Sequence, residues 1–151
     1  MKYIAHRGNI NSKNIERENS PEYIKEALDK GYDVEVDIWY VDDKFFFGHD
    51  KPQYEVDIWK FYKSTEFSKI WFHCKNNEAL FVASFKWFFK KYFWHENDDF
   101  TLTSDKYIWT FPGKKLTYNS ICVLPETVNY TENELKICTG ICSDFIENYK
   151  N

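Results

Sequence analysis

Two acidic residues alternate with apolar residues in the segment VEVDI, which covers residues 34–38. Successive side chains of a strand point to opposite faces, so Glu35 and Asp37 would share one face of a strand. Two neighbouring carboxylates repel each other, and they lose hydration on burial, unless a cation or protons neutralise them. Carboxylate oxygens are also the preferred ligands of Mg²⁺ and Ca²⁺. The pair predicts a divalent-cation site, and the alternative is an edge strand whose acids face solvent.

Histidines lie near the ends of apolar runs, where α/β sheets and barrels build their sites. His49 follows a turn and the run FFFG, which returns the chain towards the two acids, and His6 follows the run YIA. Two imidazoles beside a bound cation can act as a general base and a general acid. His73 and His95 occupy similar positions. The alternative for any single one of these histidines is an ordinary residue of the core or rim, without a role in catalysis.

Two positively charged side chains could bind a phosphate group. Arg7 follows His6 directly and offers a forked donor to phosphoryl oxygens, and Lys75 offers a point charge two residues after His73. Cationic side chains that lie along the surface are the alternative. Acids, histidines and cations together indicate the hydrolysis or transfer of a phosphate ester.

The elements that would position these residues alternate between strands and helices. Ser20 and Pro21 form a helix-start signal, and Gly31 follows the last apolar residue at helical spacing, which predicts a helix between them. The remaining predictions are strands at 3–6, 34–38, 45–49 and 69–75, a short helix near 55–63, a long aromatic helix at 78–93, and mostly strands after residue 95. This order predicts an α/β fold whose parallel strands share one catalytic edge.

Four segments taken together, IAHRGN, ENSPEYIKEAL, GYDVEVDIWYVDDKFFFGHD and IWFHCKN, resemble the glycerophosphodiester phosphodiesterase family. This family is a branch of the phosphatidylinositol phospholipase C-like TIM barrels. The later segment GICSDF looks like the last barrel strand of the family. The resemblance implies a TIM (β/α)8-type barrel. A complete barrel commonly needs about 200 to 250 residues, so the expected fold is a reduced barrel, one domain over residues 1–151, with short connections in its C-terminal half.

The resemblance also implies roles for the chemical residues. Glu35 and Asp37 would hold a divalent cation, Mg²⁺ or Ca²⁺, and His6 and His49 would be the acid/base pair. Which histidine is the acid and which the base stays open. The sequence motifs therefore predict a metal-dependent catalytic centre in the first half of the chain.

Three further positions match the family at the substrate side of this centre. Arg7 and Lys75 would bind the phosphate, and Glu18, in a Glu-Asn-Ser motif, would lie at the rim of the site. Where the family commonly has a third acidic ligand, this sequence has His73. A histidine ligand lowers the negative charge of the site and can favour Mn²⁺ or Zn²⁺, so the identity of the metal stays open.

The activity implied is a metal-dependent phosphodiester hydrolase of lipid metabolism that acts on glycerophosphodiesters or related small phosphodiesters. Two alternatives are a lyase that stops at a cyclic phosphate and a catalytically degenerate barrel that binds phosphorylated ligands. The alcohol groups of the substrate and the oligomeric state stay open.

Composition limits the partners and the compartment. The formal net charge is −4, which does not predict a nucleic-acid-binding surface. The longest apolar stretch, residues 80–93, contains three lysines and does not predict a membrane anchor. The four cysteines form no closely spaced CxxC pair, and the first residues, MKYIAHRG, do not resemble a secretory signal. These features predict reduced thiols and a cytoplasmic protein.

Overall fold

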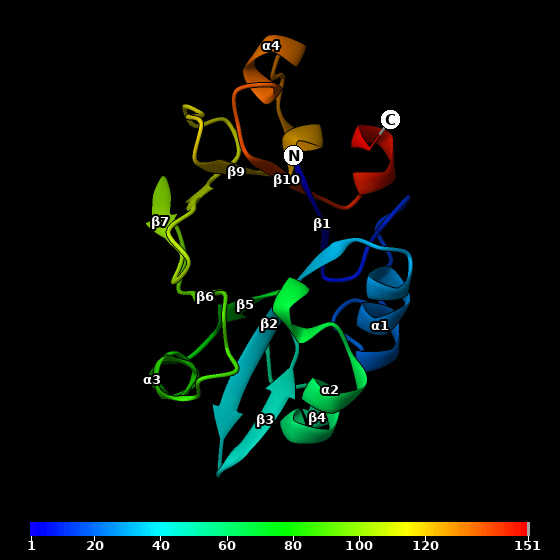
Figure 1. Ribbon diagram of the computed structural model, residues 1–151, viewed down its shortest axis with the longest axis vertical. Coiled ribbons are helices and arrows are strands. Elements are labelled where there is room, and N and C mark those ends of the chain that lie inside the picture. Colours follow the sequence, from blue (N-terminus) through cyan, green and yellow to red (C-terminus); the bar gives the residue numbers. More distant parts are fainter. Residues whose placement is uncertain (151) are drawn as a thin grey trace.

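One mixed sheet organises the computed structural model, which describes residues 1–150 (Figure 1). Within these residues the sheet contains ten strands: β1 (Lys2–His6), β2 (Asp33–Val41), β3 (Lys44–Phe47), β4 (Tyr54–Val56), β5 (Ile70–Cys74), β6 (Tyr92–Phe93), β7 (Phe100–Leu102), β8 (Ile108–Thr110), β9 (Ser120–Val123) and β10 (Gly140–Ser143). The α-helices of the same residues are α1 (Pro21–Asp29), α2 (Ile58–Ser64), α3 (Asn77–Phe85) and α4 (Glu132–Leu135). Single 3₁₀ turns form η1 (Phe67–Lys69), η2 (Pro125–Thr127) and η3 (Ile146–Tyr149).

Parallel pairing runs through the middle of the sheet in the order β6-β5-β2-β1-β10-β9-β8. Strands β3 and β4 extend β2 as an antiparallel hairpin, and β7 pairs antiparallel with β8. β2 is therefore the central strand, since it pairs with β1, β3 and β5. Its position brings the ends of β1 and β5 to the same edge of the sheet.

The expected reduced TIM (β/α)8-type barrel is wrong. The sheet is mixed and curls into a half-barrel, and among residues 1–150 no strand pairing joins β6 to β7 (Figure 1). An alternating barrel needs a helix after each strand to cover its outer surface. Here the connections from β6 to β9 contain no helix in the described residues, and the connection from β9 to β10 contains only η2 and the four-residue α4. Too few helices are present to complete an outer ring.

The first predicted helix is confirmed as α1. The Ser20 side chain accepts a hydrogen bond from the Tyr23 amide, Pro21 begins the helix, and Gly31 has a φ of +86°. This is the pattern of an N-cap, a first-turn proline and a glycine that ends a helix in the left-handed region. The buried side of α1 then covers the outer face of the sheet through Ile24 and Ala27.

The predicted helix at 78–93 is wrong in its length, because α3 ends at Phe85. Lys86 has extended backbone angles, φ −81° and ψ 110°. The chain then turns, so that the consecutive residues Phe88 and Phe89 are both buried, where their rings meet Phe67. Packing of these two rings against the outer face of the sheet therefore overrides the helical pattern of the sequence.

Aromatic rings fill much of the outer core, between the sheet and the helices. Phe72 of β5 is fully buried, and its ring centroid lies 4.8 Å from Phe89, 5.0 Å from Phe67 and 6.5 Å from Phe47. A second cluster, on the concave face, consists of Trp71 and six other buried residues: Ile4, Phe93, Trp109, Ile121, Val123 and Cys142. The concave cluster supports the face that carries the acids of β2.

Two expectations from composition concern the thiols and the membrane. The four cysteines are buried and free in the described residues, as the sequence predicts. Among the helices of residues 1–150, none combines the length and the apolar character that a bilayer crossing requires.

Replacing Phe72 by alanine should lower the free energy of unfolding by about 3 to 5 kcal/mol, because the cavity left between three rings cannot collapse fully. The measurement is urea unfolding followed by circular dichroism. The matched control is Phe81→Ala, since the Phe81 side chain is exposed, and it should stay within about 0.5 kcal/mol of the wild type. Equal losses in both variants would contradict the assignment of the core.

Candidate functional site

The acids of the central strand are buried on the concave face. Glu35 is 1% exposed and Asp37 is fully buried. Parallel pairing of β2 with β5 sets Asp37 opposite His73 and Glu35 opposite Trp71. Because β1 pairs on the other side of β2, His6 lies opposite Glu35. The sheet register therefore gathers acids and imidazoles at one place, and the alternative of a solvent-facing edge strand does not hold.

His73 bridges the two carboxylates. Its Nδ1 lies 3.2 Å from Asp37 Oδ1 and 3.6 Å from Glu35 Oε1, and its Nε2 lies 2.7 Å from the carbonyl oxygen of His95. A carbonyl oxygen only accepts, so Nε2 carries a proton, and Nδ1 has either a lone pair or a second proton directed at the acids. Burial alone would lower the pKa of His73, but the hydrogen bonds and charges of Asp37 and Glu35 raise it to about 9. A proton therefore occupies this position at neutral pH when no metal does.

The three side chains fit a divalent cation. Ligand atoms of Glu35, Asp37 and His73 all lie within 4.8 Å of one another. Asp37 Oδ1 is buried and lies 3.2 Å from His73 Nδ1 and 3.8 Å from Lys75 Nζ, so protonated side chains balance its charge when no metal is bound. Two carboxylates and an imidazole suit Mn²⁺ or Zn²⁺ as well as harder cations. The donor set is consistent with the expected metal site.

Arg7 is the second partner of Asp37. Its Nε lies 2.9 Å from Asp37 Oδ2, its Nη1 donates to Glu18 Oε2 at 3.1 Å, and its backbone amide donates to Glu35 Oε2 at 3.2 Å. Lys75 is farther away, with Nζ 3.8 Å from Asp37 Oδ1. Burial would raise the pKa of Asp37, but contacts with His49 and His73 and the charge of Arg7 hold it well below its usual range. The protein's own cations therefore balance these acids, so their burial does not require a metal ion.

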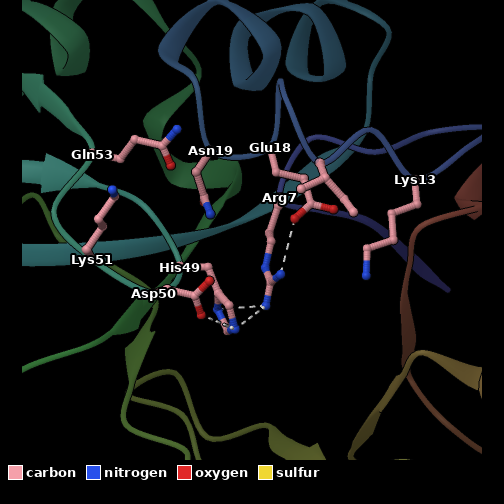
Figure 2. A pocket seen from close by; sticks show the side chains of 9 residues that line it. Arg7, Lys13, Glu18, Asn19, His49, Asp50, Lys51 and Gln53 are labelled. Atoms are coloured by element: carbon pink, nitrogen blue, oxygen red, sulfur yellow. Dashed lines mark hydrogen bonds and ion pairs between the residues drawn. The ribbon is translucent and has the colours of Figure 1, made fainter.

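His49 lies at the open side of the site. Its Nδ1 is 3.4 Å from Asp37 Oδ2, and its side chain is 40% exposed. Arg7 Nη2 lies 2.8 Å from the same Nδ1 and 3.3 Å from Nε2, so the guanidinium contacts both ring nitrogens. Figure 2 shows Arg7 reaching towards both His49 and Glu18.

A cavity of about 340 Å³ opens in front of Arg7 and His49. Lys13 and Lys51 lie on opposite sides of it (Figure 2). Its remaining lining residues are Ile15, Glu18, Asn19, Asp50 and Gln53. The cavity gives a small anionic ligand access to the guanidinium of Arg7.

His6 has a buried carboxylate partner, Asp144, which was not among the predicted site residues. Its Nδ1 lies 2.7 Å from Asp144 Oδ1, and its Nε2 lies 3.9 Å from Glu35 Oε2. Burial would raise the pKa of Asp144, but the hydrogen bond and charge of His6 and the amide of Asn9 lower it. Asp144 therefore fixes the orientation of the His6 ring. Its place directly after the run GICS was the signal that could have identified it.

Two asparagines complete the network, and neither has a periodic signal in the sequence. Asn19 donates to Asp37 Oδ2 at 2.9 Å and accepts from the Asp37 amide at 3.0 Å. Asn9 donates to Glu18 Oε1 at 2.9 Å and to Asp144 Oδ1 at 2.8 Å. Both side chains are buried. They hold the carboxylates in place through neutral hydrogen bonds.

The structure brings together every residue that the sequence suggests. His6 contacts Glu35, Arg7 contacts Glu18, and four basic side chains surround Asp37: Arg7, His49, His73 and Lys75. His95 contributes its carbonyl oxygen to His73. The proximity is a structural fact, whereas the catalytic and ligand roles stay predictions.

Comparison of the chain with known protein families, with curated proteins and with solved structures gives no match. The resemblance to glycerophosphodiester phosphodiesterases therefore rests on the motifs alone.

The proton on His73 should make stability depend on pH when metal is removed by a chelator. The folded state keeps this proton up to about pH 9, whereas an unfolded histidine loses it near pH 6.5. The stabilisation is complete below pH 6.5 and is lost as the pH rises towards 9, a fall of about 3 kcal/mol in the free energy of unfolding. Urea unfolding at several pH values measures it.

His73→Gln should remove this slope. The control is His95→Gln, because burial lowers the pKa of His95, so its proton is already lost in this interval. A wild type and a His73→Gln variant with the same slope would contradict the protonated bridge.

Proposed function

We propose that the protein is a metal-dependent phosphodiesterase that hydrolyses small phosphodiesters of the glycerophosphodiester type. One observation carries the proposal. The imidazoles of His6 and His49 and the guanidinium of Arg7 all lie at the buried Glu35–Asp37 pair. The motif resemblance supports the same chemistry. A cytoplasmic location and a small phosphodiester as the partner belong to this proposal.

Glu35, Asp37 and His73 would hold the cation, which could be Mg²⁺, Ca²⁺, Mn²⁺ or Zn²⁺. When bound, a divalent cation polarises a phosphodiester and neutralises the charge that develops on its oxygens. His73 must lose its Nδ1 proton to become a ligand, so metal binding would release a proton and strengthen as the pH rises. Support for this ligand set comes from the closeness of its ligand atoms, which all lie within 4.8 Å of one another.

Arg7 would bind the phosphate. Its Nη2 faces the cavity, while contacts with Asp37 and Glu18 hold the rest of the guanidinium in a fixed direction. A guanidinium held this way can give two parallel hydrogen bonds to phosphoryl oxygens. Lys75, which is partly buried beside Asp37, would add positive charge to the same region.

We assign His6 as the general base, because Asp144 can stabilise the imidazolium that forms when the ring takes a proton. Water would attack phosphorus and give its proton to His6. The bond from phosphorus to the leaving alkoxide would break, and His49, at the cavity wall, would enter the reaction as the imidazolium and give its proton to that alkoxide. The products are a phosphomonoester and an alcohol, so atoms and charge balance.

His6→Ala and His49→Ala should each lower turnover by about 10² to 10⁴-fold. The assay is release of p-nitrophenol from bis-p-nitrophenyl phosphate, together with a panel of glycerophosphodiesters, in the presence of Mg²⁺, Ca²⁺, Mn²⁺ or Zn²⁺. Phosphorus NMR of the product separates hydrolysis from the alternative of a cyclic phosphate. Turnover near that of the wild type in both folded variants would remove the proposed roles.

Asp144→Asn tests the positioning of His6. The amide no longer stabilises an imidazolium, so turnover should fall by about 10² to 10⁴-fold and the acidic limb of the pH–rate profile should move. The control is Asp29→Asn at the exposed end of α1, which should leave both unchanged. A purely structural role would lower the unfolding free energy without moving the profile.

A second candidate, binding of a phosphorylated ligand without turnover, has one observation in its favour. Arg7, His73 and Lys75 already balance the carboxylates, so the site is electrostatically complete without an ion. Calorimetry with glycerol phosphate would then detect binding in the presence of a chelator, and the substrate panel would show no product with any of the four cations.

A further inference from the structure

Large aromatic side chains are exposed together on α2, on α3 and on the segment after α3. Trp59 is 46% exposed, Phe81 64%, Phe85 73% and Trp87 65%. Single exposed apolar residues are ordinary on protein surfaces, but a gathering of rings marks an interaction surface. We call Trp59, Phe81, Phe85, Trp87 and the partly buried Tyr62 the aromatic patch.

Ring contacts join the aromatic patch into two groups. In the first, Trp59 stacks on Tyr62 with centroids 5.3 Å apart, and Tyr62 meets the edge of Trp87 at 5.7 Å. In the second, Phe81 and Phe85 lie one turn of α3 apart with centroids at 4.7 Å. Trp87 follows Phe85 by two residues, so the two groups are neighbours along the chain.

The orientation of α3 is not what core packing alone would produce. Its buried residues are the small Ala79 and Ala83, whereas the phenylalanines of the same helix point outwards. Burying a phenylalanine ring contributes about 1.5 to 3 kcal/mol relative to exposing it. Folding therefore gains nothing from Phe81 and Phe85, and an apolar environment outside the protein could supply this contribution.

Lysines surround these rings. Lys63 lies over the Trp59 ring at 4.9 Å, Lys90 lies over the Trp87 ring at 5.8 Å, and Lys60 and Lys86 are exposed beside them. Among residues 1–150, no ion pair joins any of these four to a carboxylate.

The charge of this region is opposite to that of the whole chain. Residues 58–91 contain seven lysines and two acids, whereas the chain as a whole has a net charge of −4. Three of the seven lysines are paired with carboxylates: Lys69 with Glu66, Lys75 with Asp37 and Lys91 with Asp33. The other four, Lys60, Lys63, Lys86 and Lys90, make the aromatic patch a locally basic surface on an acidic protein.

We propose that the aromatic patch and its four lysines bind the surface of an anionic lipid bilayer. Tryptophan and phenylalanine rings favour the boundary between headgroups and acyl chains, and lysines beside them attract acidic headgroups. The free ammonium groups, which have no fixed carboxylate partner, suit a fluid layer of headgroups better than the set ion pairs of a protein partner. This binding is peripheral, and it does not rest on the proposed phosphodiesterase activity.

The test is co-sedimentation of the full chain with sucrose-loaded vesicles of phosphatidylcholine alone or of phosphatidylcholine with phosphatidylserine. Binding to the mixed vesicles and much weaker binding to neutral ones is expected. Lys63→Gln with Lys90→Gln should weaken binding to the mixed vesicles by about 25-fold, about fivefold for each lysine. Phe81→Ser with Phe85→Ser should weaken binding by about tenfold or more for each ring removed.

The matched control combines Tyr118→Ser with Lys115→Gln, which removes an exposed ring and an exposed charge away from the aromatic patch. This variant should bind like the wild type, and all variants should keep the circular dichroism spectrum and the turnover of the wild type. Absence of vesicle binding overturns the proposal. So does equal weakening in the control, or a concentration-dependent dimer that Phe81→Ser with Phe85→Ser abolishes while vesicles are not bound.

Discussion

The ionised carboxylate of Asp37, fully buried in the central strand, is the constraint on which the site depends. An unpaired buried charge costs several kcal/mol, so its neighbours must be cations or hydrogen-bond donors. Arg7, His73 and Lys75 supply the positive charge, His49 contacts the same carboxylate, and Asn19 supplies both a donor and an acceptor. The loops after β1, β3 and β5 are thereby directed towards one point. The same cations that allow burial are the groups that a phosphate ester needs.

Local elements were predictable because their signals are local. The cap at Ser20 and the alternation in β2 each depend on a few neighbouring residues, and both are found. Barrel closure was not predictable in this way, because it depends on connections after residue 95 that contain no outer helices in the described chain. The end of α3 was missed for a related reason. Phe88 and Phe89 fit a helical pattern, but their burial against Phe67 requires the chain to turn.

The candidate site was predictable where residue type and strand position coincide. Glu35, Asp37 and His73 lie on adjacent strands in register, as the alternation and the order of elements indicate. Asp144, Asn9 and Asn19 were missed, because loop residues follow no periodic pattern. Their roles depend on contacts with residues far away in the sequence. The electrostatic premise was also incomplete. A sequence shows that two acids are close, but it does not show that Arg7 ends 2.9 Å from one of them.

The hydrogen bond between His6 and Asp144 joins residues 138 positions apart, across the parallel contact of β1 with β10. During synthesis on a ribosome, β1 emerges well before β10, so the first strand initially lacks this neighbour. Until β10 pairs with β1, the imidazole of His6 lacks its carboxylate. The orientation of the His6 ring is therefore fixed late, by a residue that is made long after it.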